Sequence, residues 1–339
     1  MKIKGFIAIS ASIVVILLGV VLGSVYISLG DTFSIIGHKV FGVQLSEGVK
    51  TTAVLIIWTS RLPRALLAFI VGGALSVSGA VMQSVLRNPL ASSYTIGVSS
   101  GASLGACMVI LYGVTIPFIG PLTLPLIGFV FGFGTILLAI SFATCLDGQM
   151  ENNTIILAGM VFSLFVNAVT TLMSALSREH MQRLIYWQMG SFSMQGWQPV
   201  IIFVPVAILG TLLITHYNRE LDMMTFGEQQ AKTMGVNLKR IKWILLILSA
   251  VLTGSANAFV GVIGFVDLVA PHIVRKLFGS SHRRVIPLSA LFGGSFMVVC
   301  DLIARTVVSP SELPVGAVTA LIGAPFFAYI YFSRRAKKC

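Results

Sequence analysis

Charged residues, cysteine and histidine are all scarce in this chain. Only 10% of its 339 residues are charged, against roughly 25% in typical soluble domains, which excludes an ordinary soluble protein. The four cysteines, Cys107, Cys145, Cys300 and Cys339, form no CxxC pair and have no metal-ligand spacing, so we expect no disulfide framework, no metal site and no bound cofactor. No G-x-x-x-x-G-K-[ST] segment occurs, so the chain lacks a Walker A phosphate cradle. No nucleophile and base lie at a convincing spacing, which argues against an intramembrane enzyme.

Apolar residues are abundant, at 56%, and the mean hydropathy is +0.95. Because a helix of about 20 apolar residues crosses a hydrocarbon core of ~30 Å, the pattern predicts an all-α membrane protein with about ten spans in one domain, 1–339. The predicted spans cover residues 5–29, 62–86, 92–112, 122–145, 154–176, 200–217, 241–260, 262–278, 285–307 and 314–332. The first is too long for a signal peptide and is interpreted as a retained helix.

The net charge of +12 would suggest nucleic acid in a soluble protein. With ten spans and both termini in the cytoplasm, however, most Lys and Arg fall on the inner side, as the positive-inside rule requires. The basic balance therefore indicates a lipid bilayer as partner and no nucleic acid.

Two polar segments interrupt the spans, 177–198 on the outer side and 218–240 on the inner side. In the inner one, Met223, Phe226, Ala231 and Met234 recur at near-helical spacing, which predicts a short amphipathic helix at the membrane surface. A plain connector needs only a few residues, so we expect this segment to dock a protein, with an interfacial connector as the alternative.

Two passages place polar or helix-breaking residues within apolar sequence. The segment 87–106 contains a Pro-broken turn and a serine-rich helix start, and 261–275 contains Asp267, Pro271, His272 and Arg275. A charge at the bilayer centre costs about 2.5–3.5 kcal/mol on insertion scales, and irregular backbone is tolerated there where it lines a cavity or is buried in protein. Both passages thus indicate a transport path, although turn formation alone would explain Asn88 and Pro89.

Four motifs carry a family resemblance: RLPRALLAFIVGGALSVSG, RNPLA with GVSSGASLGA, LTGSANAFVGVIGFV with LVAPHIVR, and ELPVGAVTALIGAPFF. In this order, from Arg61 to Phe327, they resemble the FecCD/BtuC-type permeases that import iron-siderophores, haem and cobalamin; residues 1–60, the first helix and outer loop, have no matching motif. The resemblance implies a type II ABC importer subunit of ten helices that pairs with a second permease around a translocation path in the bacterial cytoplasmic membrane. It also implies two cytoplasmic ATPase subunits, which hold ATP and Mg, and an extracytoplasmic substrate-binding protein.

The resemblance also implies residue roles. It places Arg61, Arg64 and Arg305 at the outer rim, where they would dock the binding protein; snorkelling anchors are the alternative. It places Asn88 and Leu90 at the inner gate, with Asn152 and Asn153 in a second gate segment or in a helix cap. Ser99 and Ser100 are assigned to the path from the serine-rich helix start itself. In the inner segment, numbered 218–240, the residues that resemble the family's ATPase-coupling helices are Gly227, Glu228, Ala231 and Gly235.

Pro271 and His272 match a family PH pair, in which Pro would break the helix and His would fix its end, with haem ligation by His272 as a lesser alternative. The chain departs from the family pattern twice. Ala91, Ser92 and Ser93 stand where the family has ADP, and Asp267 stands where it has glycine. Arg275 is eight residues from Asp267, about 12 Å along an ideal helix, so direct pairing is not expected.

The sequence therefore predicts the permease of an ABC importer, with a siderophore as the first expected cargo, then haem, then cobalamin. A secondary transporter is the competing class. It would need its own ion-coupling site, for which Asp267 and Asp301 are the intramembrane candidates.

Overall fold

The computed structural model describes residues 2–46, 48–148, 150–177, 180–193 and 195–336, and in these ranges the chain forms helices and no strand. Six helical stretches are long and apolar enough to cross a membrane: Thr51–Val85, Gly120–Leu146, Asn152–Leu176, Trp197–His216, Leu238–Val260 and His282–Thr306. Three shorter apolar stretches, Gly5–Val21, Val98–Tyr112 and Val315–Tyr329, and the 13-residue helix Val266–Phe278 bring the described chain to the ten predicted spans.

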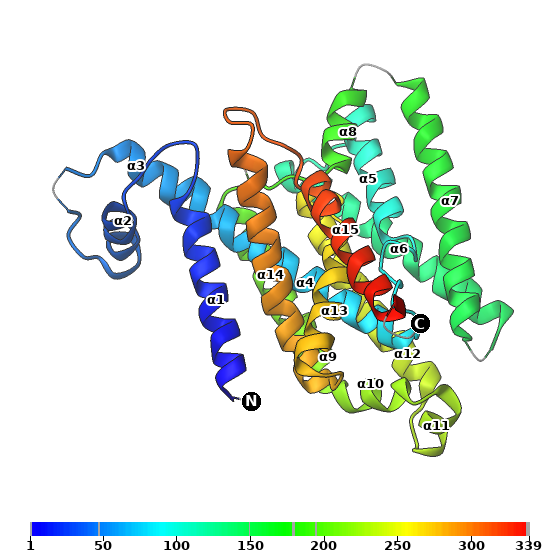
Figure 1. The fold of residues 1–339 in the computed structure, drawn as a ribbon. Coiled ribbons are helices and arrows are strands. Elements are labelled where there is room, and N and C mark those ends of the chain that lie inside the picture. Colours follow the sequence, from blue (N-terminus) through cyan, green and yellow to red (C-terminus); the bar gives the residue numbers. More distant parts are fainter. Residues whose placement is uncertain (1, 47, 149, 178–179, 194, 337–339) are drawn as a thin grey trace.

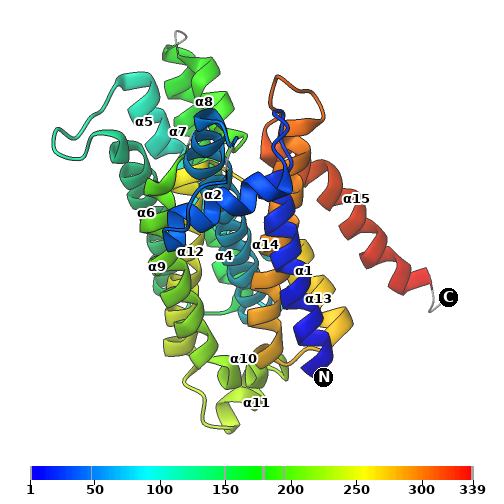
Figure 2. The same cartoon turned by 90° about the vertical axis from the view of Figure 1, so that its left-hand side faces the viewer.

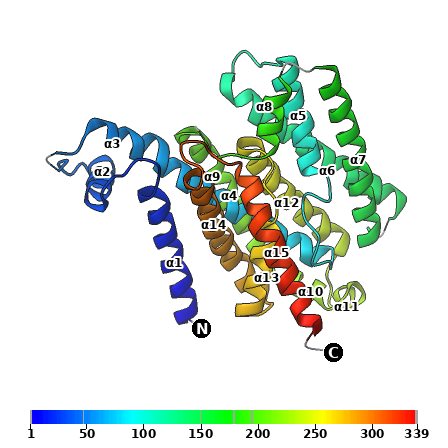
Figure 3. The ribbon, with the colours of Figure 1, turned by 45° about the horizontal axis from the view of Figure 1, so that its top comes forward.

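The spanning helices are α1 (Lys2–Val21), α4 (Leu62–Val85), α5 (Val98–Tyr112), α6 (Thr123–Leu146), α7 (Asn152–Leu176), α9 (Trp197–His216), α12 (Leu238–Val260), α13 (Val266–Phe278), α14 (His282–Thr306) and α15 (Val315–Ala336). Short helices connect them: α2 (Leu29–Phe41), α3 (Thr51–Leu55), α8 (Met181–Gln188), α10 (Asn218–Thr225) and α11 (Glu228–Thr233), with the 3₁₀ turn Gly120–Leu122 before α6. Figures 1 and 3 show the start of α1 and the end of α15 directed toward the end of the bundle that carries α10 and α11, as the predicted topology requires. We refer to that end as the inner end.

Helix α4 lies at the centre and is buried along nearly all of its length, in contact with α9, α12, α13 and α14. Its crossing with α14 is close because both helices carry glycine there. A Cβ on Gly72 would lie 2.3 Å from the carbonyl oxygen of Gly293. Small residues at such crossings allow membrane helices to gain van der Waals contact along their backbones.

The outer helices α7 and α15 expose large apolar side chains, among them Leu164, Phe165 and Leu321. Figure 2 shows α15 standing off from the bundle toward its C-terminal end. These exposed apolar surfaces are suited to lipid or to a second membrane subunit.

Several predicted boundaries were wrong. The second span was predicted to begin at Leu62, but α3, a π-helical turn at Ile56–Arg61 and α4 form one continuous stretch from Thr51. The predicted single amphipathic helix of the inner segment is two helices, α10 and α11, separated at Gly227, whose φ of +123° suits glycine. Residues 30–46, expected to be loop, contain most of α2, which is capped by the Ser28 hydroxyl.

Candidate functional site

The three outer arginines converge on one another but point into the protein. Arg64 donates to both carboxylate oxygens of Asp301, at 2.8 to 3.1 Å, and to Glu312 at 2.8 Å. Arg305 lies 3.7 Å from the Asp301 carboxylate and donates to the Gly19 carbonyl. These side chains tie α4, α14 and α1 together at the outer end of the bundle.

Arg61 has a comparable role at the end of α1. It donates to the carbonyls of Val21, at 2.8 Å, and Val25, which satisfies groups that a helix end leaves without partners. Arg61, Arg64 and Arg305 are only 5%, 7% and 7% exposed. Contact with an acidic partner would require these intramolecular bonds to open, so docking by the three arginines stays a prediction.

Glu312 lies in the outer loop before α15. Burial alone would raise the pKa of its carboxyl, but the hydrogen bond and charge of Arg64 outweigh burial and hold that pKa below its ordinary value. Asp301, a candidate for ion coupling, is 1% exposed and bonded to Arg64. This geometry gives Asp301 a structural role.

The passage from Gly261 to Phe265 is non-helical inside the bundle. Helix α12 ends at Val260, Phe265 has a φ of +68°, and α13 begins at Val266. The break therefore precedes Pro271, which lies within α13, so the expectation that Pro271 breaks the helix was wrong. The role expected of His272 stays a prediction. His272 packs against Phe327, with ring centroids 5.7 Å apart.

Pro271 nevertheless has a local effect, because proline has no N–H to donate to the carbonyl four residues earlier. That carbonyl belongs to Asp267, and the Gln83 amide of α4 donates to it at 3.2 Å. Gly79 makes the approach possible, since a Cβ there would lie 1.9 Å from the same oxygen. This hydrogen bond and the close approach at Gly79 hold α13 against the inner half of α4.

The two departures from the family pattern lie in direct contact. The Ser92 hydroxyl donates to the carboxylate of Asp267, which is buried in the first turn of α13, where a helix favours negative charge. Arg275 instead contacts Gln83, the Ala80 carbonyl and Ser84. The expectation that Asp267 and Arg275 do not pair agrees with these contacts.

The first predicted gate segment, with Asn88 and Leu90, lies on a turn at the inner end. The Asn88 side chain accepts from the Leu90 N–H at 2.9 Å, and Leu90 is exposed. Ser99 and Ser100 are buried in the first turn of α5, and the Asn257 amide of α12 donates to Ser99 at 3.0 Å. This geometry describes a folded turn and a polar contact between helices; their roles at a gate and on a path stay predictions.

A cavity of about 710 Å³ is lined by residues of the two predicted gate segments and of the predicted coupling segment. Its lining includes Arg87 beside Asn88, Asn152 and Asn153 at the start of α7, and Gly227 and Glu228 at the start of α11. Ala231 is a buried residue of α11, whereas Gly235 follows the helix and is exposed. Three segments distant in sequence are thus neighbours at the inner end.

Two buried polar contacts at this end were missed from the sequence. His282, at the start of α14, contacts Asp222 of α10 and Ser84 of α4, each at 2.6 Å. Lys242 of α12 contacts Glu228 of α11 at 2.7 Å. The positive-inside pattern places both segments at the inner end but cannot distinguish a buried cation from a solvated one; the apolar residues that flank Lys242 were the available signal.

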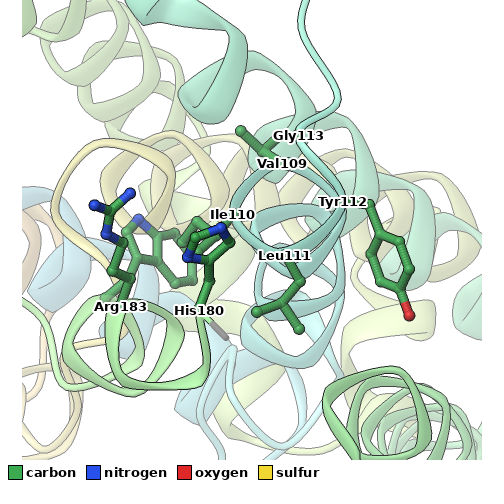
Figure 4. A pocket seen from close by; sticks show the side chains of 8 residues that line it. Val109, Ile110, Leu111, Tyr112, Gly113, His180 and Arg183 are labelled. Atoms are coloured by element: carbon green, nitrogen blue, oxygen red, sulfur yellow. The ribbon is translucent and has the colours of Figure 1, made fainter. Parts of the chain in front are cut away.

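A second cavity, of about 730 Å³, lies between the end of α5 and α8. Figure 4 shows His180 and Arg183 on the side facing α5, with Tyr112 directed away from them. The cavity lies away from the gate segments, so it adds nothing to their geometry. Among the described residues, no group of three or more His, Cys, Asp or Glu is placed to hold a metal ion.

A ten-helix bundle with a helix break at membrane depth, and with inner helices in contact with the turns at its inner end, defines a membrane-spanning transport subunit. Residues 11–333 match the family model described as the FecCD transport family. The chain belongs to this family, whose members are the permease subunits of ABC transporters and are not themselves enzymes.

Similarity to individual relatives agrees with this family membership. The chain is 43% identical to the ABC transporter permease protein YvrB of Bacillus subtilis, over 93% of this chain and 89% of YvrB. It is 37% identical to the cobalamin import permease BtuC of Halobacterium salinarum, over 88% of this chain and 79% of BtuC. A solved structure of an ABC transporter assigned to the metal-chelate type, in an inward-facing conformation, matches with a TM-score of 0.85 and 28% identity, over 98% of this chain and all of the other.

Proposed function

We propose that this chain is the permease of an ABC importer that carries an iron chelate, a siderophore first, across the bacterial cytoplasmic membrane. The observation that carries the proposal is the similarity of the whole chain to a transporter of the metal-chelate type. Relatives named for iron(III)-citrate, hemin and cobalamin import support a bulky chelate as cargo and leave haem and cobalamin as the alternatives.

In this proposal two cytoplasmic ATPase subunits hold ATP and Mg and contact α11 through the surface around Gly227, Glu228, Ala231 and Gly235. The cavity between α11 and the start of α7 supports that role, because a force applied to α11 reaches the proposed gate residues Asn152 and Asn153 over a short distance.

The proposed path passes Asn88, Leu90, Ser99, Ser100, Asp267, Pro271 and His272. A second permease, identical or related, would face the exposed apolar surfaces of α7 and α15. An extracytoplasmic binding protein would deliver the cargo to the outer end.

Affinity purification of the chain from membranes in mild detergent tests the proposal. We expect an ABC ATPase to co-purify, and the partner binding protein to hold an iron chelate when its bound molecule is identified by mass spectrometry. If the binding protein holds haem or cobalamin instead, that molecule is the cargo and the assignment as an importer permease stands. Uptake by the chain without any ATPase would overturn the proposal in favour of a secondary transporter.

A further inference from the structure

Lys242 is the most completely buried cation at the inner end among the described residues. It lies near the start of α12, and its side chain is 0% exposed. An ammonium group has three N–H donors and no acceptor. All three have partners here: the Met150 carbonyl at 2.7 Å, the Asn152 side-chain oxygen at 2.8 Å and the Glu228 carboxylate at 2.7 Å.

These partners belong to different parts of the chain. Glu228 begins α11, and Asn152 is the first residue of α7. Met150 precedes α7 with a φ of +56°, a left-handed conformation that is uncommon for a residue with a side chain. The bond from Lys242 thus holds a strained turn as well as a helix start.

Packing alone does not account for a lysine at this position. Removing a charge from water is expensive, and a well-packed apolar side chain is often as stabilising as a buried ion pair. What an ammonium adds is directional: three short bonds that hold α11, α12 and the start of α7 at fixed separations. The geometry therefore favours a role in keeping these elements together when they move.

We propose that Lys242 is a positioning residue that joins α11 to the start of α7, so that a displacement imposed on α11 is transmitted to the inner gate. This inference rests on the proposed function, in which an ATPase contacts α11 and α7 begins at the gate. It adds the residue through which the two are connected. The contacts of His282 with Asp222 and with Ser84 anchor α10 separately, to α14 and α4.

The test measures whether α11 and α7 keep their spacing while the transporter changes state. Asn153 and Gln229 line the same cavity, so Asn153→Cys and Gln229→Cys are introduced into a chain whose four native cysteines are replaced by alanine. The complex with its ATPase is treated with a short bifunctional methanethiosulfonate, without nucleotide and after trapping with ATP and vanadate. With Lys242 present, we expect cross-linking rates in the two states to agree.

With Lys242→Met, we expect the two rates to differ by about threefold or more, since coupling through a contact network is commonly of this size. ATP hydrolysis by the complex should persist, because the ATPase itself is unchanged. Glu228→Gln/Lys242→Met should be no worse than Lys242→Met alone, since both changes break the same link. Lys39→Met, which removes an exposed lysine of α2, is the matched control and should behave as the parent.

A parent chain whose cross-linking rate changes with state, or a Lys242→Met chain whose rate does not, would overturn the inference while leaving the importer assignment intact. If no ATPase assembles with the parent chain, the proposed function fails and the inference falls with it. A variant that merely loses stability would show reduced complex yield and the same cross-linking rates in both states, which also counts against the proposed role.

Discussion

The contact between Arg64 and Asp301 offers the sharpest separation between a structural and a docking role for the outer arginines. Asp301 is 1% exposed, and the Arg64 guanidinium makes its shortest bond to Asp301 at 2.8 Å. We consider three variants: Arg64→Met, Asp301→Leu and the two combined.

Removing one partner of a buried pair leaves an uncompensated charge and destabilises by about 3–5 kcal/mol, whereas replacing both by apolar side chains is often close to neutral. Asp301→Leu should reach the upper part of that range, because it leaves both Arg64 and Arg305 without the central carboxylate. Arg64→Met should cost about 3 kcal/mol, because Arg305 remains near Asp301. The double variant should cost about 1–2 kcal/mol, since Arg305 is then left without its carboxylate partner and the partly exposed Glu312 without Arg64.

Equilibrium unfolding in mixed micelles, followed by circular dichroism as the denaturing detergent is increased, gives these free energies. Capture of the binding protein by folded transporter is measured in parallel. If Arg64 instead acts in docking, Arg64→Met weakens capture and leaves the unfolding free energy within about 0.5 kcal/mol of the parent. That result, or single-variant costs that simply add in the double variant, would refute the structural interpretation.

Three further outcomes follow from other contacts. Gly293→Ala should lower the unfolding free energy by about 1–3 kcal/mol, because its Cβ would lie 1.7 Å from the Ser76 hydroxyl. Gly134→Ala is the control, since a Cβ there would have nothing within 4 Å. Equal losses in the two variants would contradict the close crossing of α4 and α14. Ser92→Asp alone should impair uptake, because it places a second carboxylate against that of Asp267. Combining it with Asp267→Gly should restore at least half of the parent's uptake. If Asp267→Gly does not rescue Ser92→Asp, the direct contact between the two residues is contradicted. Glu312→Gln should lower the free energy of unfolding by up to about 1 kcal/mol at pH 7. Because folding lowers the pKa of the Glu312 carboxyl, this difference between parent and variant should fade as the pH drops below the ordinary pKa of 4.5. A difference in unfolding free energy that grows in acid would contradict a lowered pKa.

The number and order of the spans could be predicted from the sequence because the signal is additive over about 20 residues. A few misplaced boundary residues do not change a hydropathy average. Boundaries depend on single contacts instead. The second span was predicted to begin at Leu62, yet the helix extends back through a π-helical turn that ends at Arg61, whose guanidinium donates to the Val21 carbonyl at the end of α1.

Side-chain partners were much less predictable. Asp267 looked anomalous because its partner, Ser92, is 175 residues away in the chain. Both residues were recognised as departures from the family pattern, but no periodicity connects them. Lys242 was counted with the inner-side charges because charge counting is insensitive to depth, and only its packing against Met150, Asn152 and Glu228 shows that it is buried.

Reconstitution tests the central claim most directly. The chain is incorporated into liposomes with its ATPase and supplied outside with the binding protein loaded with a ⁵⁵Fe-labelled hydroxamate siderophore. We predict that label enters only when ATP is present on the ATPase side, and that a Walker A lysine substitution in the ATPase abolishes entry. Entry driven by a proton or sodium gradient, with no ATPase present, would contradict the account.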